Sequence, residues 1–458
     1  MLLEWLLRGS IVVAVVVPAT TLLGLAAAWL LGASLSEKVV GRTTTGALAA
    51  STVAAFVALV AGLVVGHTLE VGPLAWFSAG EHTFELALYA DPLALVATFV
   101  TSLLSLTAMR FSVHYLHREP GFFRFFFLFL LFTVATHTIV LASSYDQLFV
   151  GWELSGITSV LLIAFFHDRN DPVRSSLRAL LTYRLTDVGL LAGIVLMHRS
   201  VGASHFDRLA DAKDAGLGLE AGVGALAALG LTLSAMGKAA QFPFGGWLVR
   251  AMEGPTPSSA LYYGALSVHT GIFLLLRAEP ILRSSPFVSM VLVGVGLGTA
   301  VVASALGRVQ TDAKSALAYA CRAQLGLMFL ECGLGFYRLA AWHMLGHACL
   351  RAFQMLRAPS ILQDHVRARA AAREPLFAAP DQGSESLLRL RSYAAAHHGF
   401  YVSVLAERMV AVPVAWISQR IEALELFWTR PLTPLDSHRS DTPRPPLAGS
   451  SKPGPSAP

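Results

Sequence analysis

Long apolar runs recur along the chain and are separated by short polar segments. A helix needs about 20 apolar residues to cross the hydrocarbon core of a bilayer. The pattern therefore predicts an all-α, polytopic membrane bundle of about eleven transmembrane helices, one of them broken. The predicted spans cover residues 10–31, 46–66, 92–109, 124–142, 147–166, 177–198, 222–250, 258–277, 286–307, 315–331 and 338–356.

The seventh of these spans carries polar residues that an ordinary membrane helix avoids. Lys238 lies deep in the apolar run and is followed by Gln241 and Pro243. A lysine near the bilayer centre costs about 3 kcal/mol even on insertion scales, which give lower costs than other estimates. Pro243 lacks a backbone N–H and is expected to break the helix one turn after Lys238. Broken helices at this depth line buried or wet cavities, so this stretch predicts an ion-binding site.

The composition changes after Leu356. The following residues are polar and rich in alanine and arginine, and a later segment alternates apolar with charged residues. That alternation predicts an amphipathic helix that lies on the membrane or on a partner. The Pro/Ser-rich end is typical of disorder. The predicted regions are N-terminal transmembrane helices (1–90), a membrane core (91–356), a cytoplasmic linker (357–399), the amphipathic helix (400–430) and a disordered tail (431–458).

Composition supports a membrane protein and argues against other classes. Of the 458 residues, 55% are hydrophobic and only 14% are charged, whereas soluble domains carry about a quarter charged residues. The net charge of +5 does not indicate nucleic-acid binding, because the basic residues fall in loops between spans. The cysteines Cys321, Cys332 and Cys349 lie in apolar segments without a C-x-x-C pair, so neither a metal site nor a disulfide framework is expected. No cleavable signal peptide is evident, because the first run is long enough to span and lacks a clear cleavage site.

The charges in the loops predict an orientation. Basic residues follow the odd-numbered spans, whereas the loop after the second span holds only acidic charges. The positive-inside rule then places the N-terminus outside and the C-terminal region in the cytoplasm. The expected location is a bacterial inner membrane. The basic residues after the odd-numbered spans are Lys38, Arg42, Arg110, Arg118, Arg124, Arg169, Arg174, Arg250, Arg308 and Lys314.

Glu153 and Lys238 are the strongest candidates for moving a proton. Opposite charges a few ångström apart in a low dielectric stabilise each other, and separating them would let the lysine release its proton. The alternative is that Glu153, beside Trp152, only reaches toward water at the interface. Arg184 and Asp187 lie three residues apart on one helix face and can pair, either as a structural ion pair or in transport.

Histidines in the later spans suggest a second part of a relay. His343 and His347 lie one helical turn apart, and Arg351 follows one turn later. The sequence offers no third metal ligand nearby, so a hydrated proton relay is favoured over a metal site. His269 can join this relay or simply bond a backbone carbonyl. Lys314, at the cytoplasmic entrance of the tenth span, is equally well explained as a determinant of topology.

Motifs for cofactor chemistry are absent from the sequence. It contains no Walker loop, no Rossmann fingerprint, no H-E-x-x-H and no G-x-S-x-G. Glycines such as Gly294, Gly296 and Gly298 lie within an apolar span and are typical of helix-packing surfaces. We therefore expect no cofactor, and any redox chemistry would belong to another subunit.

Taken in order, these residues resemble the proton-translocating antiporter-like subunits. That superfamily includes the L-type (subunit 5) membrane subunit of respiratory complex I, the A subunit of Mrp antiporters and the membrane subunit of the two-part DAB inorganic-carbon complexes. The matching pieces, over roughly residues 90–356, are Gly151–Glu153, Arg184–Asp187, Gly237–Pro243, Gly254–Leu261, Asp312–Lys314, Leu317–Tyr319 and His343–His347.

The resemblance implies roles for individual residues. Glu153 would be the glutamate of the first half-channel and Lys238 its broken-helix lysine, while His343 and His347 would belong to a central hydrophilic axis. It also implies two inverted five-helix repeats, the general design in which broken helices meet at the membrane midplane.

Three departures from the family pattern change what is expected. Tyr263 stands where the family usually has histidine, and Arg351 stands where it has lysine. Arginine stays protonated, so it can hold a field but cannot relay a proton by releasing one. The chain also turns polar after Leu356, so we expect the second repeat to be shortened.

Three functions remain open on the sequence. The first is a proton-translocating subunit of a respiratory-type NADH:quinone oxidoreductase or related complex, without a redox centre of its own. The second is the proton-conducting subunit of an inorganic-carbon uptake complex with a soluble zinc-containing partner. The third is a non-conducting membrane anchor. The expected partners are the other subunits and the lipid bilayer, and the expected ion is the proton, with sodium as the alternative.

Overall fold

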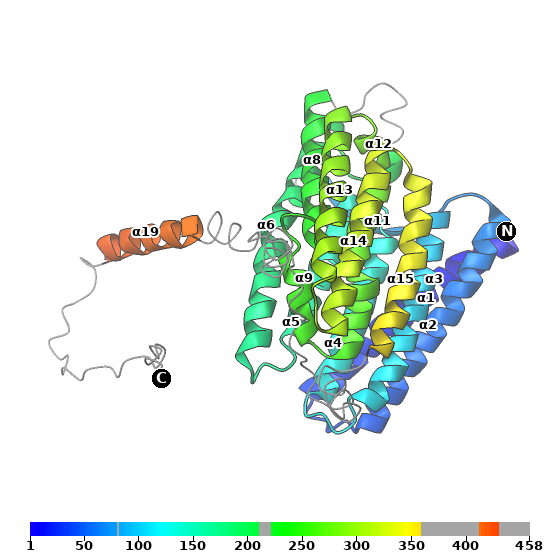
Figure 1. The fold of residues 1–458 in the computed structure, drawn as a ribbon. Helices are drawn as coiled ribbons and strands as arrows, with labels where there is room; N and C mark the ends of the chain where they lie inside the picture. The colour runs from blue at the N-terminus through cyan, green and yellow to red at the C-terminus, as the bar shows by residue number, and fades with distance from the viewer. Residues whose placement is uncertain (80–81, 210–220, 359–411, 430–458) are drawn as a thin grey trace, which may run out of the picture. The chain divides into compact units, whose positions relative to one another are not determined.

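The computed structural model describes residues 1–79, 82–209, 221–358 and 412–429. The chain divides into two compact units, Met1–Phe400 and Tyr401–Pro458. The described part of the first unit is a bundle of helices with one two-stranded sheet (Figure 1).

Every span predicted from hydropathy falls on a helix. The elements of the first unit are α1 (Leu2–Leu30), α2 (Glu37–Val65), β1 (Leu69–Ala79), β2 (His82–Ala90), α3 (Pro92–Tyr115), α4 (Phe122–Val140), α5 (Tyr145–Ile163), α6 (Asn170–Val201), α8 (Ala221–Lys238), α9 (Gly246–Arg250), η1 (Ala251–Glu253), α10 (Thr256–Ser258), η2 (Ser259–Ala265), α11 (Ser267–Arg277), α12 (Glu279–Leu282), α13 (Pro286–Gly307), α14 (Ala313–Gly333) and α15 (Tyr337–Arg357).

Seven helical stretches in the described part are long and apolar enough to cross a membrane: α1, α2, α3, α4, α6, Thr256–Arg277 and α13. The other predicted spans coincide with α5, α8, α14 and α15, which are shorter or carry more ionisable residues. These features define an all-α polytopic membrane protein. The eighth span is continuous but contains the π-helix η2, which the sequence pattern did not predict.

A β-hairpin occupies the acidic loop predicted after the second span. β1 and β2 pair antiparallel, with irregular register between Val71 and Leu74 and again between Ala75 and Phe77. Phe77 and Phe84 stack across the strands with ring centroids 4.4 Å apart, a contact that stabilises antiparallel pairs. The charge pattern identified this segment only as a connection between two spans and indicated no strands in it.

An ion pair joins the end of this hairpin to the helix bundle. Asp91 caps α3 by accepting a hydrogen bond from the Ala94 N–H at 2.8 Å. The same carboxylate receives two bonds from Arg277 at the end of α11, at 2.7 and 2.8 Å. Such two-pronged pairs fix orientation as well as distance. The hairpin and the α3 end are thereby held over the end of α11.

Glycines let two pairs of helices approach closely. Gly189 of α6 faces Gly230 of α8, and a Cβ on Gly189 would lie 2.5 Å from the Gly230 carbonyl oxygen. On α13 and α14 the same arrangement involves Gly296 and Gly326, where the distances would be 2.5 and 2.7 Å. Small residues at such crossings allow backbone-to-backbone packing in membranes. The crossing of α6 with α8 fixes two of the helices that carry the site.

The described part of the second unit is the single helix α19 (Val412–Thr429). Its apolar residues Trp416, Ile417, Ile421 and Leu424 are each at least half exposed within the chain, and Arg420 lies over the Trp416 ring at 5.2 Å. This helix falls inside the amphipathic segment predicted at 400–430. Residues 400–411, most of the predicted linker and the predicted tail lie outside the described residues.

Candidate functional site: a buried lysine at a broken helix

The break in the seventh span begins at the lysine itself. α8 ends at Lys238, and the chain turns through Ala240, whose φ is +51°, before α9 starts at Gly246. The helix therefore stops about one turn earlier than Pro243 alone would require. As a result, the last side chain of α8 is a lysine that is fully buried.

Side chains from three elements satisfy the backbone groups freed by the break. Arg322 of α14 donates from Nε to the Ala240 carbonyl at 2.8 Å. The N–H of Phe242 donates to Thr299 of α13 at 2.9 Å, and Trp247 donates from Nε1 to the Gly237 carbonyl at 3.0 Å. An unpaired backbone group in an apolar interior costs several kcal/mol, so these contacts offset the cost of interrupting the helix at membrane depth.

Lys238 contacts a carbonyl and two aromatic rings. Its Nζ donates to the Trp152 carbonyl oxygen at 3.0 Å and lies 4.9 Å from the ring centroids of both Trp152 and Tyr183. Aromatic faces attract a cation most strongly where water is excluded. The ammonium group is thus held by neutral groups, so a carboxylate is not its direct partner.

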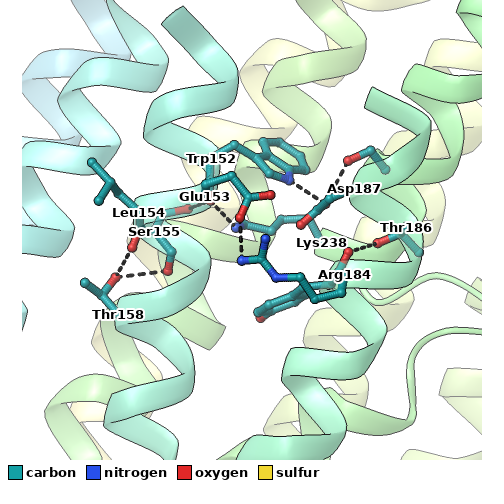
Figure 2. Close-up of polar contacts among 11 residues, drawn as sticks. Trp152, Glu153, Leu154, Ser155, Thr158, Arg184, Thr186, Asp187 and Lys238 are labelled. Atoms are coloured by element: carbon teal, nitrogen blue, oxygen red, sulfur yellow. Dashed lines mark hydrogen bonds and ion pairs between the residues drawn. The ribbon is translucent and has the colours of Figure 1, made fainter. Parts of the chain in front are cut away.

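The acidic residues beside the lysine are bonded to other groups. Glu153 of α5 forms an ion pair with Arg184 of α6. Asp187 accepts from Trp152 Nε1 at 2.7 Å and from the Ser234 hydroxyl at 3.0 Å. Figure 2 shows the side chains of Glu153, Asp187 and Lys238 converging between α5, α6 and α8. Both pairings expected from the sequence, Glu153 with Lys238 and Arg184 with Asp187, are therefore corrected.

The cluster holds equal numbers of positive and negative groups, but only two of the four form a direct ion pair. Two cations (Arg184 and Lys238) and two carboxylates (Glu153 and Asp187) share the space, yet direct ion pairing joins only Glu153 and Arg184. Burying an ion is costly unless opposite charge and hydrogen bonds compensate it. A change of bonding partner within the cluster therefore leaves its net charge unchanged, whereas the loss of a proton changes that charge by one.

A chain of hydrogen bonds links three of the predicted relay residues. His269 Nε2 lies 2.9 Å from His347 Nδ1, and Arg351 donates from Nε to His347 Nε2 at 3.0 Å. Because arginine has only donors, His347 must accept at Nε2. Its proton then sits on Nδ1 and points to His269. All three side chains are buried.

His343 belongs to a different contact. Its Nδ1 lies 2.9 Å from Glu331 Oε1 and its Nε2 lies 3.1 Å from Gln324 Oε1, both on α14. The i, i+4 spacing with His347 thus places the two rings near each other, with centroids 6.1 Å apart, but they bond to different partners.

Tyr263, which departs from the family pattern, and the candidate Lys314 make other contacts. Tyr263, within η2, donates its hydroxyl to the Ser159 carbonyl at 2.8 Å. Lys314 is half-buried in the first turn of α14, whose N-terminus Asp312 caps through the Ser315 N–H at 2.7 Å. Within the described residues, His, Cys, Asp and Glu nowhere form a group of three placed to hold a metal ion.

Comparison with known families agrees with this architecture. Residues 142–375, about half of the chain, match the family described as the transmembrane region of NADH:quinone oxidoreductase and Mrp antiporters. Residues 76–126 match the N-terminal region of complex I chain 5. The chain belongs to the complex I subunit 5/Mrp antiporter membrane-subunit family.

Curated relatives in this family are considerably longer. The chain is 35% identical to the chloroplastic NAD(P)H-quinone oxidoreductase subunit 5 of Anthoceros angustus, over 65% of this chain and 41% of the relative. It is 33% identical to NADH-ubiquinone oxidoreductase chain 5 of Metridium senile, over 74% of this chain and 56% of the relative. The chain thus matches about half the length of these subunit 5 proteins.

Solved structures show the same fold. A chain of the Mrp complex from Dietzia sp. DQ12-45-1b aligns with a TM-score of 0.62 and 26% identity, over 85% of this chain and 40% of that chain. A chain of the membrane-bound sulfane sulfur reductase, an archaeal respiratory membrane complex, aligns with a TM-score of 0.63 and 20% identity, over 76% of this chain and 70% of that one. At 20% identity the second comparison supports the fold alone.

Several residues that contact the site in this family member were not singled out from the sequence. Arg322 and Glu331 are ionisable residues inside a predicted span, which is itself a signal of a functional or buried position. Tyr183 and Ser234 carry no such signal, because aromatic and hydroxyl residues are common in membrane helices. Only the packing of α5, α6 and α8 brings them to Lys238 and Asp187.

Proposed function

We propose that this chain is a proton-translocating membrane subunit of a respiratory-type complex, with Lys238 as the group that takes up and releases the proton. The observation that supports this most strongly is the fully buried ammonium at the end of α8, bonded to a carbonyl oxygen and flanked by the Glu153–Arg184 pair. A buried, ionisable residue on a broken membrane helix is a functional site by default.

Arg184 would act as the switch between two charge arrangements. It lies three residues from Asp187 on α6, within reach of that carboxylate as well as of Glu153. When Arg184 turns to Asp187, Glu153 is left to attract a proton onto Lys238. When Arg184 returns to Glu153, Lys238 loses the attraction of Glu153 and releases its proton, while Asp187 stays engaged by its hydrogen bonds from Trp152 and Ser234. Two opposite charges about 4 Å apart attract each other by about 4 kcal/mol at an effective dielectric of 20. Gaining or losing a free carboxylate at that distance would therefore shift the protonation of Lys238.

The released proton would pass toward the histidine chain. α11 packs against α8 and carries His269, which is hydrogen-bonded to His347. Arg351 would keep the chain oriented, since it donates to His347 and does not release a proton itself. The relay therefore consists of Glu153, Lys238, His269 and His347, with Arg351 as a fixed charge.

The partner complex is inferred from the relatives. Subunit 5 proteins of quinone oxidoreductases are 33–35% identical to the chain, so we propose partners that carry the redox centres. Affinity purification of the tagged chain from its native membrane tests this. Quinone-oxidoreductase subunits among the co-purifying proteins would support the proposal, whereas a soluble zinc protein as the sole stable partner would favour the inorganic-carbon alternative.

The conducting role can be tested by proton flux in vesicles. We expect Lys238→Met and Glu153→Gln each to lower flux through the reconstituted complex at least about tenfold, because positioned proton-transfer groups contribute that much or more. Glu279→Gln, which removes a carboxylate paired with Arg283 outside the cluster, is the matched control and should keep normal flux. Normal flux in both site variants would instead identify a non-conducting anchor, and flux that requires sodium would change the ion.

A further inference from the structure

A second cluster of ionisable residues lines a cavity at one end of α5 and α6. The cavity has a volume of about 220 Å³ and is enclosed by both strands of the hairpin, the start of α5, the end of α6 and the segment that follows α6. A single water molecule occupies about 30 Å³ of liquid, so several fit here. The hairpin thus covers a space large enough to be hydrated.

Two groups of charges face this cavity. Asp146 lies in the first turn of α5, and both its oxygens lie within 3.1 Å of His198 Nε2 on α6, while the Ser204 hydroxyl also donates to it. On the hairpin side, Glu85 lies 3.5 Å from His205 Nε2 and 3.6 Å from Arg208.

The two groups differ in their charged partners. Burial of the ring, together with the nearby Arg208 guanidinium, lowers the pKa of His205 and so disfavours its charged form. Glu85 is engaged by Arg208. Asp146 and His198 both line the cavity and bond directly to each other, with side chains about one-fifth exposed, so this pair can exchange protons with water in the cavity.

The walls of the cavity continue to the buried charge cluster. On α5, Asp146 and Val150 line the cavity, and Glu153 follows on the same face at helical spacing. On α6, Leu191 lines the cavity, and Asp187 lies one turn beyond it. Glu153 and Asp187 therefore lie one turn past the cavity floor on the two helices that form its walls.

We infer that this cavity is the water-filled mouth through which protons reach or leave Glu153, with Asp146 and His198 as the pair that exchanges them with water. The inference rests on the proposed function, because it supplies the aqueous end of the same path. The proton moves between water in the cavity and the Asp146–His198 pair, and then past Val150 and Leu191 to Glu153. The Glu85–Arg208 pair holds the hairpin over the opening.

Cysteine labelling tests whether the cavity is wet. In the full complex with Cys349→Ser, which removes the exposed native thiol, Leu191→Cys should react with a charged, membrane-impermeant methanethiosulfonate added on the hairpin side, because only a hydrated thiol ionises. Val195→Cys is the matched control. It lies one turn away on α6 and is similarly exposed (49% against 47%), but it does not line the cavity. It should stay unmodified.

Proton flux tests whether the wet cavity lies on the path. Modification of Leu191→Cys should lower flux at least about fivefold, and Asp146→Asn should do the same, whereas Asp146→Glu should restore part of it. Asp207→Asn, in the same segment but bonded to Tyr89 rather than facing the cavity, should have normal flux.

The outcomes separate this inference from the proposed function. If Leu191→Cys is unreactive, or if its modification leaves flux normal, the cavity is not the aqueous end of the proton path. A loss of flux in Lys238→Met would still support translocation in that case. Normal flux in Lys238→Met would refute the proposed function and, with it, the role of the mouth, whatever the labelling result.

Discussion

Arg351 determines which ring nitrogen of His347 carries the proton. Because it donates to His347 Nε2, the only proton of a neutral His347 lies between the two rings. His343 is one turn away yet bonds to Glu331 and Gln324 instead. His343 and His347, which lie one helical turn apart on α15, therefore belong to separate hydrogen-bonded groups.

Double-mutant cycles on proton flux can measure this separation. His269→Gln and His347→Gln should be non-additive, with the double variant about as slow as the slower single variant, because each removes the same shared bond. His343→Gln should add its own, independent effect to His347→Gln. Strong coupling between positions 343 and 347 would instead indicate a single continuous chain along α15.

Residue identities at the site were predictable, but their partners were not. Lys238, Glu153 and Asp187 stood out because ionisable side chains are rare in apolar spans. Which carboxylate Arg184 bonds depends on the angle between α5 and α6, and no local pattern encodes that angle. The expected Glu153–Lys238 and Arg184–Asp187 contacts failed for this reason.

Two glycine crossings set the spacing of neighbouring helices, one between α6 and α8 and one between α13 and α14. On α13, Gly296 contacts the backbone of Gly326, whereas Gly298, two residues later, has open space where a Cβ would be added. The same helix thus offers one glycine that packing requires and one that it does not.

This difference predicts opposite effects of the same substitution. Gly296→Ala should destabilise the protein by about 1–3 kcal/mol, because the added methyl group overlaps the α14 backbone. Gly298→Ala should be neutral or stabilising by about 0.5–1 kcal/mol, because its only expected effect is to lower the conformational entropy of the unfolded chain. Thermal unfolding of the purified variants in detergent measures both, and equal midpoints would contradict the close crossing.

Elements with a long hydrophobic period were predictable, whereas short or irregular ones were not. Each of the eleven predicted spans coincides with helix because about 20 apolar residues leave few alternatives in a bilayer. The hairpin was missed because its two strands mix charged and aromatic residues and include a Gly-Pro step. The π-helix at Ser259–Ala265 was missed because one extra residue per turn leaves no mark on hydropathy.

At the scale of the whole molecule, the chain joins a charged cluster, a histidine chain and a hairpin-covered cavity in one bundle of the complex I subunit 5/Mrp family. α6 connects two of these regions, since it carries Arg184 and Asp187 at its middle and His198 near its end. We propose that protons cross by exchange between these regions. In this proposal Lys238 is the group that takes up and releases the proton.

Proton flux through Lys238→Arg tests this central claim most directly. Arginine keeps the positive charge and much of the length of lysine but does not release its proton. The account predicts that flux in reconstituted vesicles falls at least about tenfold, as in Lys238→Met, while Lys38→Arg at the start of α2 leaves it normal. Normal flux in Lys238→Arg would show that position 238 supplies only a fixed charge, and would contradict the proposed relay.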